Sequence, residues 1–247
     1  MITVVGSYLS PYVRKALVCL DMKGLRYQID PIVPFFGSDE FSRISPLRRV
    51  PVLLDDQVIL SDSTVICEYL NERYPEPALL PQDVAQRAQS RWLEEFADSR
   101  MGDVMIWRFY HQLVIKRFVW REQPDMEMVE QSRNQDIPQI LDYLEGLLPT
   151  QGTFFDTVTI ADIAVASFFR NAGFAGLQVD AEAWPRVAEF LAQMHALPAF
   201  IQLQTFENLS LKTPIPELRE ALKAAGAPIS EHSYGAEQPR MGMFELP

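Results

Sequence analysis

The chain has 247 residues, of which 48% are hydrophobic, and a formal net charge of -11. A chain of this length can bury one large core or two smaller ones. The negative charge repels a polyanion, and no stripe of Lys and Arg with interleaved aromatic residues offsets it locally. We therefore expect no nucleic-acid partner.

The chain opens with MITVVGSYLS, which has no basic flank and too short an apolar run for a signal peptide or a membrane span. We expect a cytoplasmic protein without membrane contact. The two cysteines, Cys19 and Cys67, each lie in an apolar stretch at helical spacing, which is typical of reduced core residues. The three histidines are widely scattered without ligand spacing, so no metal site is predicted.

The first 76 residues alternate between strand and helix patterns. A β-branched run at 2–6 predicts a strand, and Ser10-Pro11 starts a helix, with serine as the N-cap and proline where a missing N–H costs nothing. Gly24 is the expected end of that helix. The remaining expected elements, in order, are a strand within 25–33, an irregular segment with a weak helix at 39–44, a hairpin around Asp55-Asp56 and a helix from Ser63. This order predicts a thioredoxin-like α/β domain.

Three prolines within PEPALLPQD, residues 75–83, must end the preceding helix and keep the chain extended. Long helical patterns without a convincing strand follow it, at 84–118, 126–148, 160–175 and 184–207. We therefore predict an α/β plus all-α fold: a thioredoxin-like domain at 1–76, a linker at 77–84, an all-helical bundle domain at 85–210 and a Pro-rich tail at 211–247. The tail is expected to wrap the surface or be partly disordered, with one short helix at 217–225.

The segment 41–74 is the richest in binding features. Val50-Pro51 places a proline directly before a buried strand, where the bond can be cis and the preceding main chain is exposed at the sheet edge. Twelve residues later, Asp62 and Ser63 stand where a strand ends and a helix begins. The Ser63 N–H and hydroxyl suit a carboxylate, and Asp62 suits an ammonium group. Each feature alone is compatible with an edge proline or a helix cap, but together they form a clamp for the end of an α-amino acid.

This stretch resembles the glutathione-binding motif of the cytosolic glutathione transferases, in which a Val-Pro opens a strand and an acidic-Ser pair precedes a helix. With the helical second domain, the resemblance covers about residues 1–207. It implies that Val50 binds the cysteinyl backbone of glutathione, with Pro51 cis, and that Asp62 and Ser63 hold the γ-glutamyl end. It also implies that Arg49 pairs with the glycyl carboxylate, unless Arg49 is only a solvated surface residue; Arg43 and Arg48 are weaker candidates for the same contact.

Catalysis in such a protein requires a donor hydrogen bond to the glutathione sulfur, because the thiol is mostly protonated at neutral pH. Ser10-Pro11-Tyr12 resembles the Ser-Pro-Phe start of the plant tau class, which places the Ser10 hydroxyl against the sulfur. Two alternatives stay open. Tyr8 lies near the catalytic hydroxyl of the tyrosine classes, and Ser7 lies near the position of the beta-class cysteine.

The resemblance implies a glutathione S-transferase that acts on a small hydrophobic electrophile or a peroxide, in detoxification, as a homodimer and without a metal. The electrophile pocket is expected to use aromatic residues of both domains, namely Tyr12, Phe36, Trp107, Tyr110 and His111, although core packing alone would also explain most of them. Two other functions remain open. One is a non-catalytic glutathione-binding or regulatory protein of the same fold, and the other is a glutathione-dependent isomerase or reductase.

Overall fold

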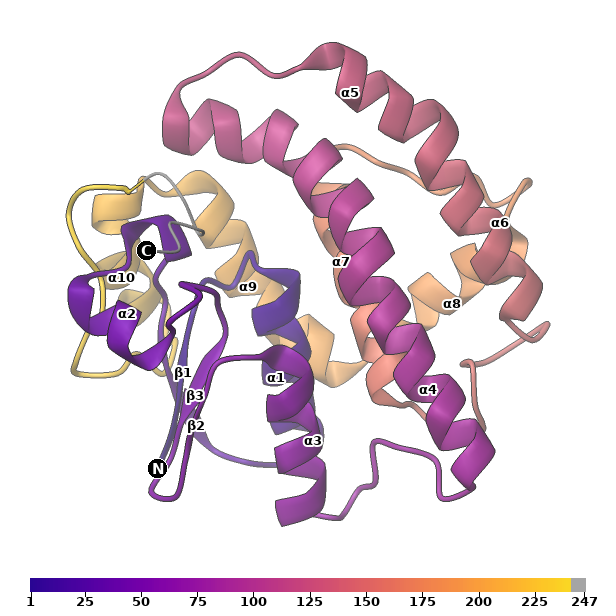
Figure 1. Cartoon of the computed structure of the whole chain (residues 1–247), viewed down its shortest axis with the longest axis horizontal. Coiled ribbons are helices and arrows are strands. Elements are labelled where there is room, and N and C mark those ends of the chain that lie inside the picture. The colour runs from indigo at the N-terminus through magenta and orange to yellow at the C-terminus, as the bar shows by residue number, and fades with distance from the viewer. Residues whose placement is uncertain (241–247) are drawn as a thin grey trace. The chain divides into compact units, whose positions relative to one another are not determined.

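A computed structural model describes residues 1–240. The chain forms two compact units (Figure 1). Unit 1 contains Met1–Pro77 together with the segment that starts at Pro198, and unit 2 contains Ala78–Leu197. The last part of the predicted tail, 241–247, lies outside the described residues.

Unit 1 is built on a four-stranded sheet in the order β2-β1-β3-β4. The strands are β1 (Ile2–Val5), β2 (Tyr27–Asp30), β3 (Val52–Leu54) and β4 (Ile59–Leu60). β1 pairs in parallel with β2, and β3 pairs antiparallel with both β1 and β4. Val5, at the end of β1, is opposite Asp30 on one side and Val52 on the other. This arrangement is the thioredoxin-like sheet that the sequence predicts.

Helices cover both faces of this sheet. α1 (Pro11–Met22) and α3 (Ser63–Arg73) pack together on one side, and α2 (Asp39–Ile44) lies on the other side, after the short 3-10 helix η1 (Pro34–Phe36) (Figure 1). Cys19 and Cys67 are fully buried between α1 and α3, and their Sγ atoms are 3.4 Å apart. Neither is in a disulfide, and both lie in the core, as expected.

The C-terminal segment changes the predicted domain boundaries. The expected helical domain 85–210 ends at Leu197, because Pro198 interrupts the helical pattern and α9 (Pro198–Lys212) belongs to unit 1. α9 packs against α1, where the Arg14 guanidinium and the Glu207 carboxylate form a buried ion pair of 2.5 Å. α10 (Ile215–Ala224) packs on α9. The sequence analysis could not predict this ion pair, because its two residues lie far apart in the sequence and share no periodic pattern.

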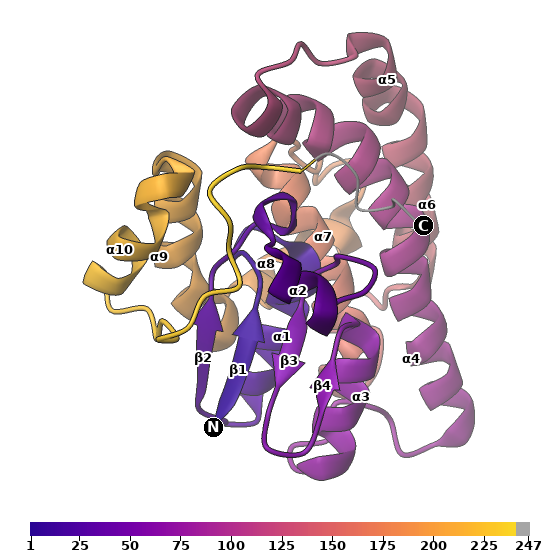
Figure 2. The same cartoon turned by 60° about the vertical axis from the view of Figure 1, so that its left-hand side comes forward.

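Residues beyond α10 follow the free edge of β2 (Figure 2). The Ile29 N–H donates to the Pro228 carbonyl at 2.8 Å, and the Ser230 N–H donates to the Ile29 carbonyl at 3.0 Å. These two bonds form a parallel bridge that extends the sheet by one position. The tail thus wraps the surface in part as expected, and up to residue 240 it does so through specific main-chain bonds.

The regular elements in the described part of unit 2 are all helices, as predicted. Its elements are α4 (Val84–Phe96), the π-helix η2 (Ala97–Trp120), α5 (Met126–Gln131), the short π-helix η3 (Ser132–Asp136), α6 (Ile137–Leu147), α7 (Ile160–Phe174) and α8 (Pro185–His195). α7 is buried along nearly its whole length and packs against α4 and η2. Among residues 1–240, no helix combines the length and the apolar character needed to cross a membrane.

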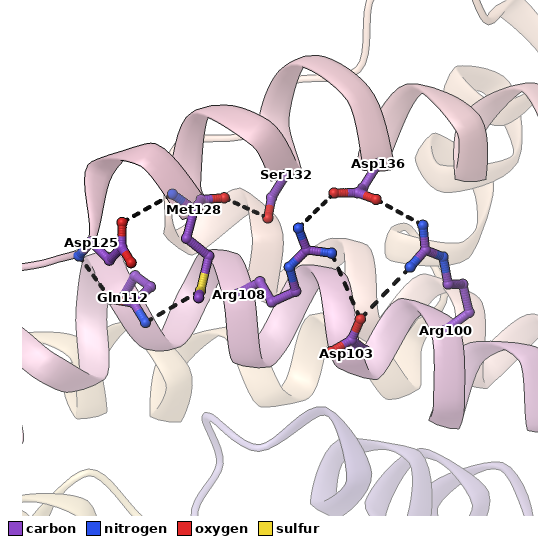
Figure 3. Close-up of polar contacts among 8 residues, drawn as sticks. All are labelled: Arg100, Asp103, Arg108, Gln112, Asp125, Met128, Ser132 and Asp136. Atoms are coloured by element: carbon purple, nitrogen blue, oxygen red, sulfur yellow. Dashed lines mark hydrogen bonds and ion pairs between the residues drawn. The ribbon is translucent and has the colours of Figure 1, made fainter.

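A polar network joins η2 to the α5–η3 segment (Figure 3). The Asp136 carboxylate lies between two guanidinium groups, 2.8 Å from Arg100 and 2.9 Å from Arg108. One helical turn after Arg108, the Gln112 side-chain oxygen accepts the N–H of Asp125. The Asp125 side chain in turn caps α5. Polar contacts therefore join η2 to the α5–η3 segment at both ends of this network.

Candidate functional site

The turn between β1 and α1 carries the predicted sulfur-binding hydroxyl. Ser10 is the N-cap of α1, and its Oγ accepts the N–H of Val13 at 3.3 Å. Its own N–H donates to the Ser7 carbonyl at 3.0 Å, and the Ser7 hydroxyl oxygen accepts the Leu9 N–H at 3.2 Å. Ser10 is half-buried, whereas Ser7 is buried. Capping uses only an acceptor lone pair of Ser10, so its O–H proton remains available to a ligand.

Tyr8, which like Ser7 is an alternative candidate for the sulfur contact, is only 1% exposed. Its ring packs against that of Phe206 in α9, with centroids 5.1 Å apart, and its carbonyl accepts a bond from Arg14. Burial raises the pKa of the Tyr8 phenol well above its usual value, and the nearby Asp21 carboxylate raises it further. Tyr8 therefore contributes to the core beneath α9.

Gly6 brings the Ser7–Ser10 turn close to Val50. Its φ of +147° is a backbone conformation that favours glycine, and a Cβ at this position would lie 2.5 Å from Val13 and 2.9 Å from Val50. The Gly6 N–H is held by the Asp30 carbonyl at 2.9 Å. The absence of a side chain here allows β1, α1 and Val50 to meet.

The Val50-Pro51 peptide bond is cis, as the family resemblance implies. The Ser45 hydroxyl holds Arg49, the residue before Val50. The Ser45 Oγ accepts the Arg49 N–H at 2.9 Å and donates its proton to the Arg49 carbonyl at 2.8 Å. Within residues 1–240, neither the N–H nor the C=O of Val50 is hydrogen-bonded to another residue. This peptide group is therefore free to pair with the main chain of a ligand.

The N-terminus of α3 carries the predicted acidic-Ser pair. Asp62 is the exposed N-cap, and its Oδ1 accepts the N–H groups of Thr64 and Val65 at 2.9 and 3.1 Å. Ser63 is buried at the first position of the helix. The sequence analysis missed Lys15, a fully buried α1 residue whose ammonium group donates to the Thr64 hydroxyl at 3.3 Å. Its only sequence signal is a lysine among apolar helix positions.

The three arginine candidates differ in their surroundings. Arg43 and Arg49 are exposed, whereas Arg48 is half-buried and its guanidinium donates to the carbonyls of Gly37 and Ser38. Burial holds the pKa of Arg48 below its usual range. Arg48 also has a φ of 50°, which is uncommon outside glycine. Arg48 thus stabilises the main chain at Gly37 and Ser38, whereas Arg49 keeps an exposed side chain beside Val50.

The aromatic residues predicted for an electrophile pocket lie in both units. Tyr12 and Phe36 are half-buried in unit 1. In unit 2, Tyr110 is 2% exposed within the core, whereas Trp107 is 38% exposed and its ring is tilted against that of His111, with centroids 5.8 Å apart. Burial lowers the pKa of His111, and the charge of Lys116 lowers it further. Trp107 and His111 are therefore more accessible to a ligand than Tyr110.

A buried carboxylate at the end of β2 was also missed by the sequence analysis. Asp30 is fully buried, and its carboxylate accepts bonds from the Arg219 guanidinium at 2.6 Å, the Ser233 hydroxyl at 2.9 Å and the Tyr234 N–H at 2.7 Å. These donors lie about 190 to 204 positions further along the chain. An acidic residue at the end of an expected strand is the only signal that the sequence offers.

Comparisons with known proteins agree with the fold described above. Residues 4–78 match the family "Glutathione S-transferase, N-terminal domain", and residues 119–193 match "Glutathione S-transferase, C-terminal domain". The chain is 30% identical to glutathione S-transferase Z1 of Arabidopsis thaliana, over 74% of this chain and 82% of that protein. It is 31% identical to maleylacetoacetate isomerase of Pseudomonas aeruginosa, over 75% and 87% of the two chains.

Among solved structures, a glutathione S-transferase from Rhodospirillum rubrum F11 superposes with a TM-score of 0.77 at 29% identity. That superposition covers 83% of this chain and 92% of the other. The thioredoxin-like sheet and the helical second unit are the two domains of one family. The chain belongs to the glutathione S-transferase family.

Proposed function

We propose that this protein is a glutathione S-transferase in which Ser10 stabilises the glutathione thiolate for attack on a small hydrophobic electrophile or a peroxide. The observation that carries the proposal is the Ser10 hydroxyl, which caps α1 through its oxygen and retains its proton for a sulfur acceptor. The helix N-terminus beside it favours negative charge. Both effects lower the thiol pKa and raise the fraction of nucleophilic thiolate at neutral pH.

The same proposal assigns the rest of the tripeptide to residues around the sheet edge. The unpaired Val50 peptide group beside the cis Pro51 pairs with the cysteinyl main chain, and Arg49 meets the glycyl carboxylate. Asp62 uses one carboxylate oxygen for its cap, which leaves the other for the γ-glutamyl ammonium. Ser63, at the first turn of α3, takes the γ-glutamyl carboxylate.

The acceptor substrate lies beyond these glutathione contacts. Tyr12 and Phe36 from unit 1, with Trp107, Tyr110 and His111 from unit 2, supply its apolar surroundings in this proposal, and no metal takes part. Exposed Trp107 is the strongest of these candidates, because an aromatic side chain 38% open to solvent has apolar surface left to bury. We further propose a cytoplasmic homodimer with a detoxification role.

Two other activities remain in view. Since one relative is named maleylacetoacetate isomerase and another glutathione S-transferase Z1, a glutathione-dependent isomerase is the second candidate. The same relatives give no support to the tau class over others, although Ser10-Pro11-Tyr12 is similar to its opening motif. A non-catalytic glutathione-binding protein of the same fold would need Val50, Asp62 and Ser63 but would have no use for the Ser10 proton.

The thiol pKa of bound glutathione tests the proposal directly. Thiolate ultraviolet absorbance should show that binding lowers the thiol pKa from its free value of about 8.5. An unshifted pKa, with no turnover of a general electrophile, would overturn the transferase assignment. If, in the presence of glutathione, the protein turns over maleylacetoacetate but no general electrophile, the isomerase is favoured instead.

Substitutions at position 10 separate hydrogen-bond donation from helix capping. Ser10→Asp keeps a capping oxygen, but it has no proton to donate and its charge repels the thiolate, so turnover should fall roughly 10- to 100-fold while the protein stays folded. Ser10→Thr retains both functions and should keep most of the activity. Ser63→Ala should weaken glutathione binding with little effect on turnover at saturation. If Tyr8→Phe lowers turnover more than Ser10→Asp, the sulfur contact belongs to Tyr8.

A further inference from the structure

The C-terminal segment from Pro228 to Arg240 borders the residues that precede Val50. We propose that this segment is a positioning element of the glutathione site, which it serves by holding residues 35–50 in place from an anchor at Asp30. The segment lies outside both stretches that match the family. The inference rests on the proposed function for the identity of the ligand, and on the contacts of unit 1 for the positioning.

Asp30 anchors the segment from inside the sheet. A fully buried carboxylate is costly unless hydrogen bonds compensate for lost water, and here the segment itself supplies the Ser233 hydroxyl and the Tyr234 N–H. Arg219 of α10 adds the opposite charge and also donates to the Ser230 carbonyl. Because the Asp30 carbonyl accepts the Gly6 N–H, one residue joins the segment to the turn that leads to Ser10.

From this anchor the segment pairs with the chain around η1 and the start of α2. The Tyr234 carbonyl accepts the Ser38 N–H at 2.8 Å, and the Ala236 N–H donates to the Phe36 carbonyl at 2.6 Å. Gly235 and Gly37 form an antiparallel bridge between these two bonds. Figure 2 shows the segment running from the edge of β2 past α2. A three-residue 3-10 helix with no side-chain cap has little stability of its own, so these bonds determine where it lies.

Two sets of contacts connect the segment to Val50. The carbonyls of Gly37 and Ser38 accept the Arg48 guanidinium, which ties the paired stretch to the residue two positions before Val50. The Tyr234 side chain packs on the same apolar cluster as Val50, around buried Phe41 and Val52. The segment therefore contacts both the main chain that leads to Val50 and the cluster on which the Val50 side chain packs.

The test removes one main-chain bond from the full-length protein. Ala236→Pro deletes the N–H that reaches the Phe36 carbonyl, and Ala236→Ser is the matched control that keeps it. For Ala236→Pro we expect the Kd for glutathione, measured by calorimetry, to rise roughly 3- to 10-fold, with turnover at saturating glutathione within about two-fold of the control. Hydrogen exchange at residues 35–48 should be at least about ten-fold faster, while exchange in β1 and α3 is unchanged.

A second variant controls for any backbone distortion that the proline itself causes. Ser233→Ala removes one donor from Asp30 without a backbone change and should raise the Kd in the same direction by a smaller factor. An unchanged Kd in both variants overturns the inference, whether or not exchange at 35–48 accelerates. If the wild-type protein fails to bind glutathione at all, the proposed function is lost. In that case, the exchange comparison between Ala236→Pro and Ala236→Ser still decides whether the segment holds residues 35–48.

Discussion

The candidate glutathione site has two sides that are held in different ways. The N-termini of α1 and α3 are fixed by bonds between residues two or three positions apart, such as Ser10 with Val13 and Asp62 with Thr64. The segment from η1 to Val50 is bordered by a stretch of chain about 200 positions away. One side therefore forms from local sequence, whereas the other depends on the end of the chain reaching the sheet.

This difference has a thermodynamic consequence. Local caps form as soon as their helices do, and each contributes about 1 kcal/mol. Long-range contacts must first overcome the entropy of closing a long loop, so they form together with the docking of α9 and α10. Changes that loosen the C-terminal segment should therefore disturb the Val50 side of the site before the Ser10 side.

The largest expected effect is at the buried ion pair between α1 and α9. Glu207→Gln leaves the Arg14 guanidinium buried without its counter-charge, which should lower the free energy of unfolding by about 3–5 kcal/mol. Urea denaturation of the full-length protein measures this loss. The double variant Arg14→Met with Glu207→Leu removes both charges and should recover most of the stability. A loss below about 1 kcal/mol in the single variant would show that α9 is not docked by this pair.

The same distinction explains which features the sequence could predict. Residue type and short spacing are sufficient for the Ser10 cap, the Asp62 cap and the order of strands and helices, and the family resemblance implied the cis Pro51. The partners of Asp30 and Arg14 lie almost 200 positions away and share no pattern with them. The boundary at Pro198 was missed for that reason: α8 and α9 have similar helical patterns, and only their packing assigns them to different units.

Unit 2 offers an intermediate case in the Asp136 network of Figure 3. Asp136 is contacted by Arg100 and Arg108, which lie 28 to 36 positions earlier on η2 and are themselves partly exposed. Asp136→Asn keeps the shape but removes the charge, and should cost about 1–3 kcal/mol in unfolding free energy. Added salt should reduce the difference between variant and wild type, because the arginines are not fully buried. A salt-independent loss would instead indicate altered packing.

The Asp62 cap provides the local counterpart, with an expected effect of about 1 kcal/mol. Asp62→Ala should lower stability by that amount, because the N–H groups of Thr64 and Val65 lose their acceptor. Asp62→Asn retains a capping oxygen and should leave stability nearly unchanged. Both variants should weaken glutathione binding if the carboxylate charge meets the γ-glutamyl ammonium. Equal glutathione affinities for Asp62→Asn and wild type would confine Asp62 to capping.

A pH dependence of stability is expected from Asp21, which lies beside α9. Asp21 lines a hollow together with Leu203 and Phe206 of α9, and burial raises the pKa of its carboxyl to about 6, against a hydrogen bond from Tyr27 that lowers it. In the unfolded chain this carboxyl ionises near pH 3.9. Stability from the protonated form is therefore complete below about pH 4 and is lost as the pH rises through about 6.

Asp21→Asn removes this titration and should gain stability relative to wild type across the same interval. Melting temperatures measured from pH 4 to 7 should give a difference curve that rises up to about pH 6 and is then flat. Asp55 is the opposite case. Burial pushes its pKa up, but hydrogen bonds from Tyr69 and from the N–H groups of Gln57 and Val58 outweigh burial and lower it. Asp55→Asn should therefore lose stability relative to wild type as the pH rises through the acid range. Difference curves with the same sign would contradict the view that hydrogen bonds stabilise the charge of Asp55 while burial destabilises that of Asp21.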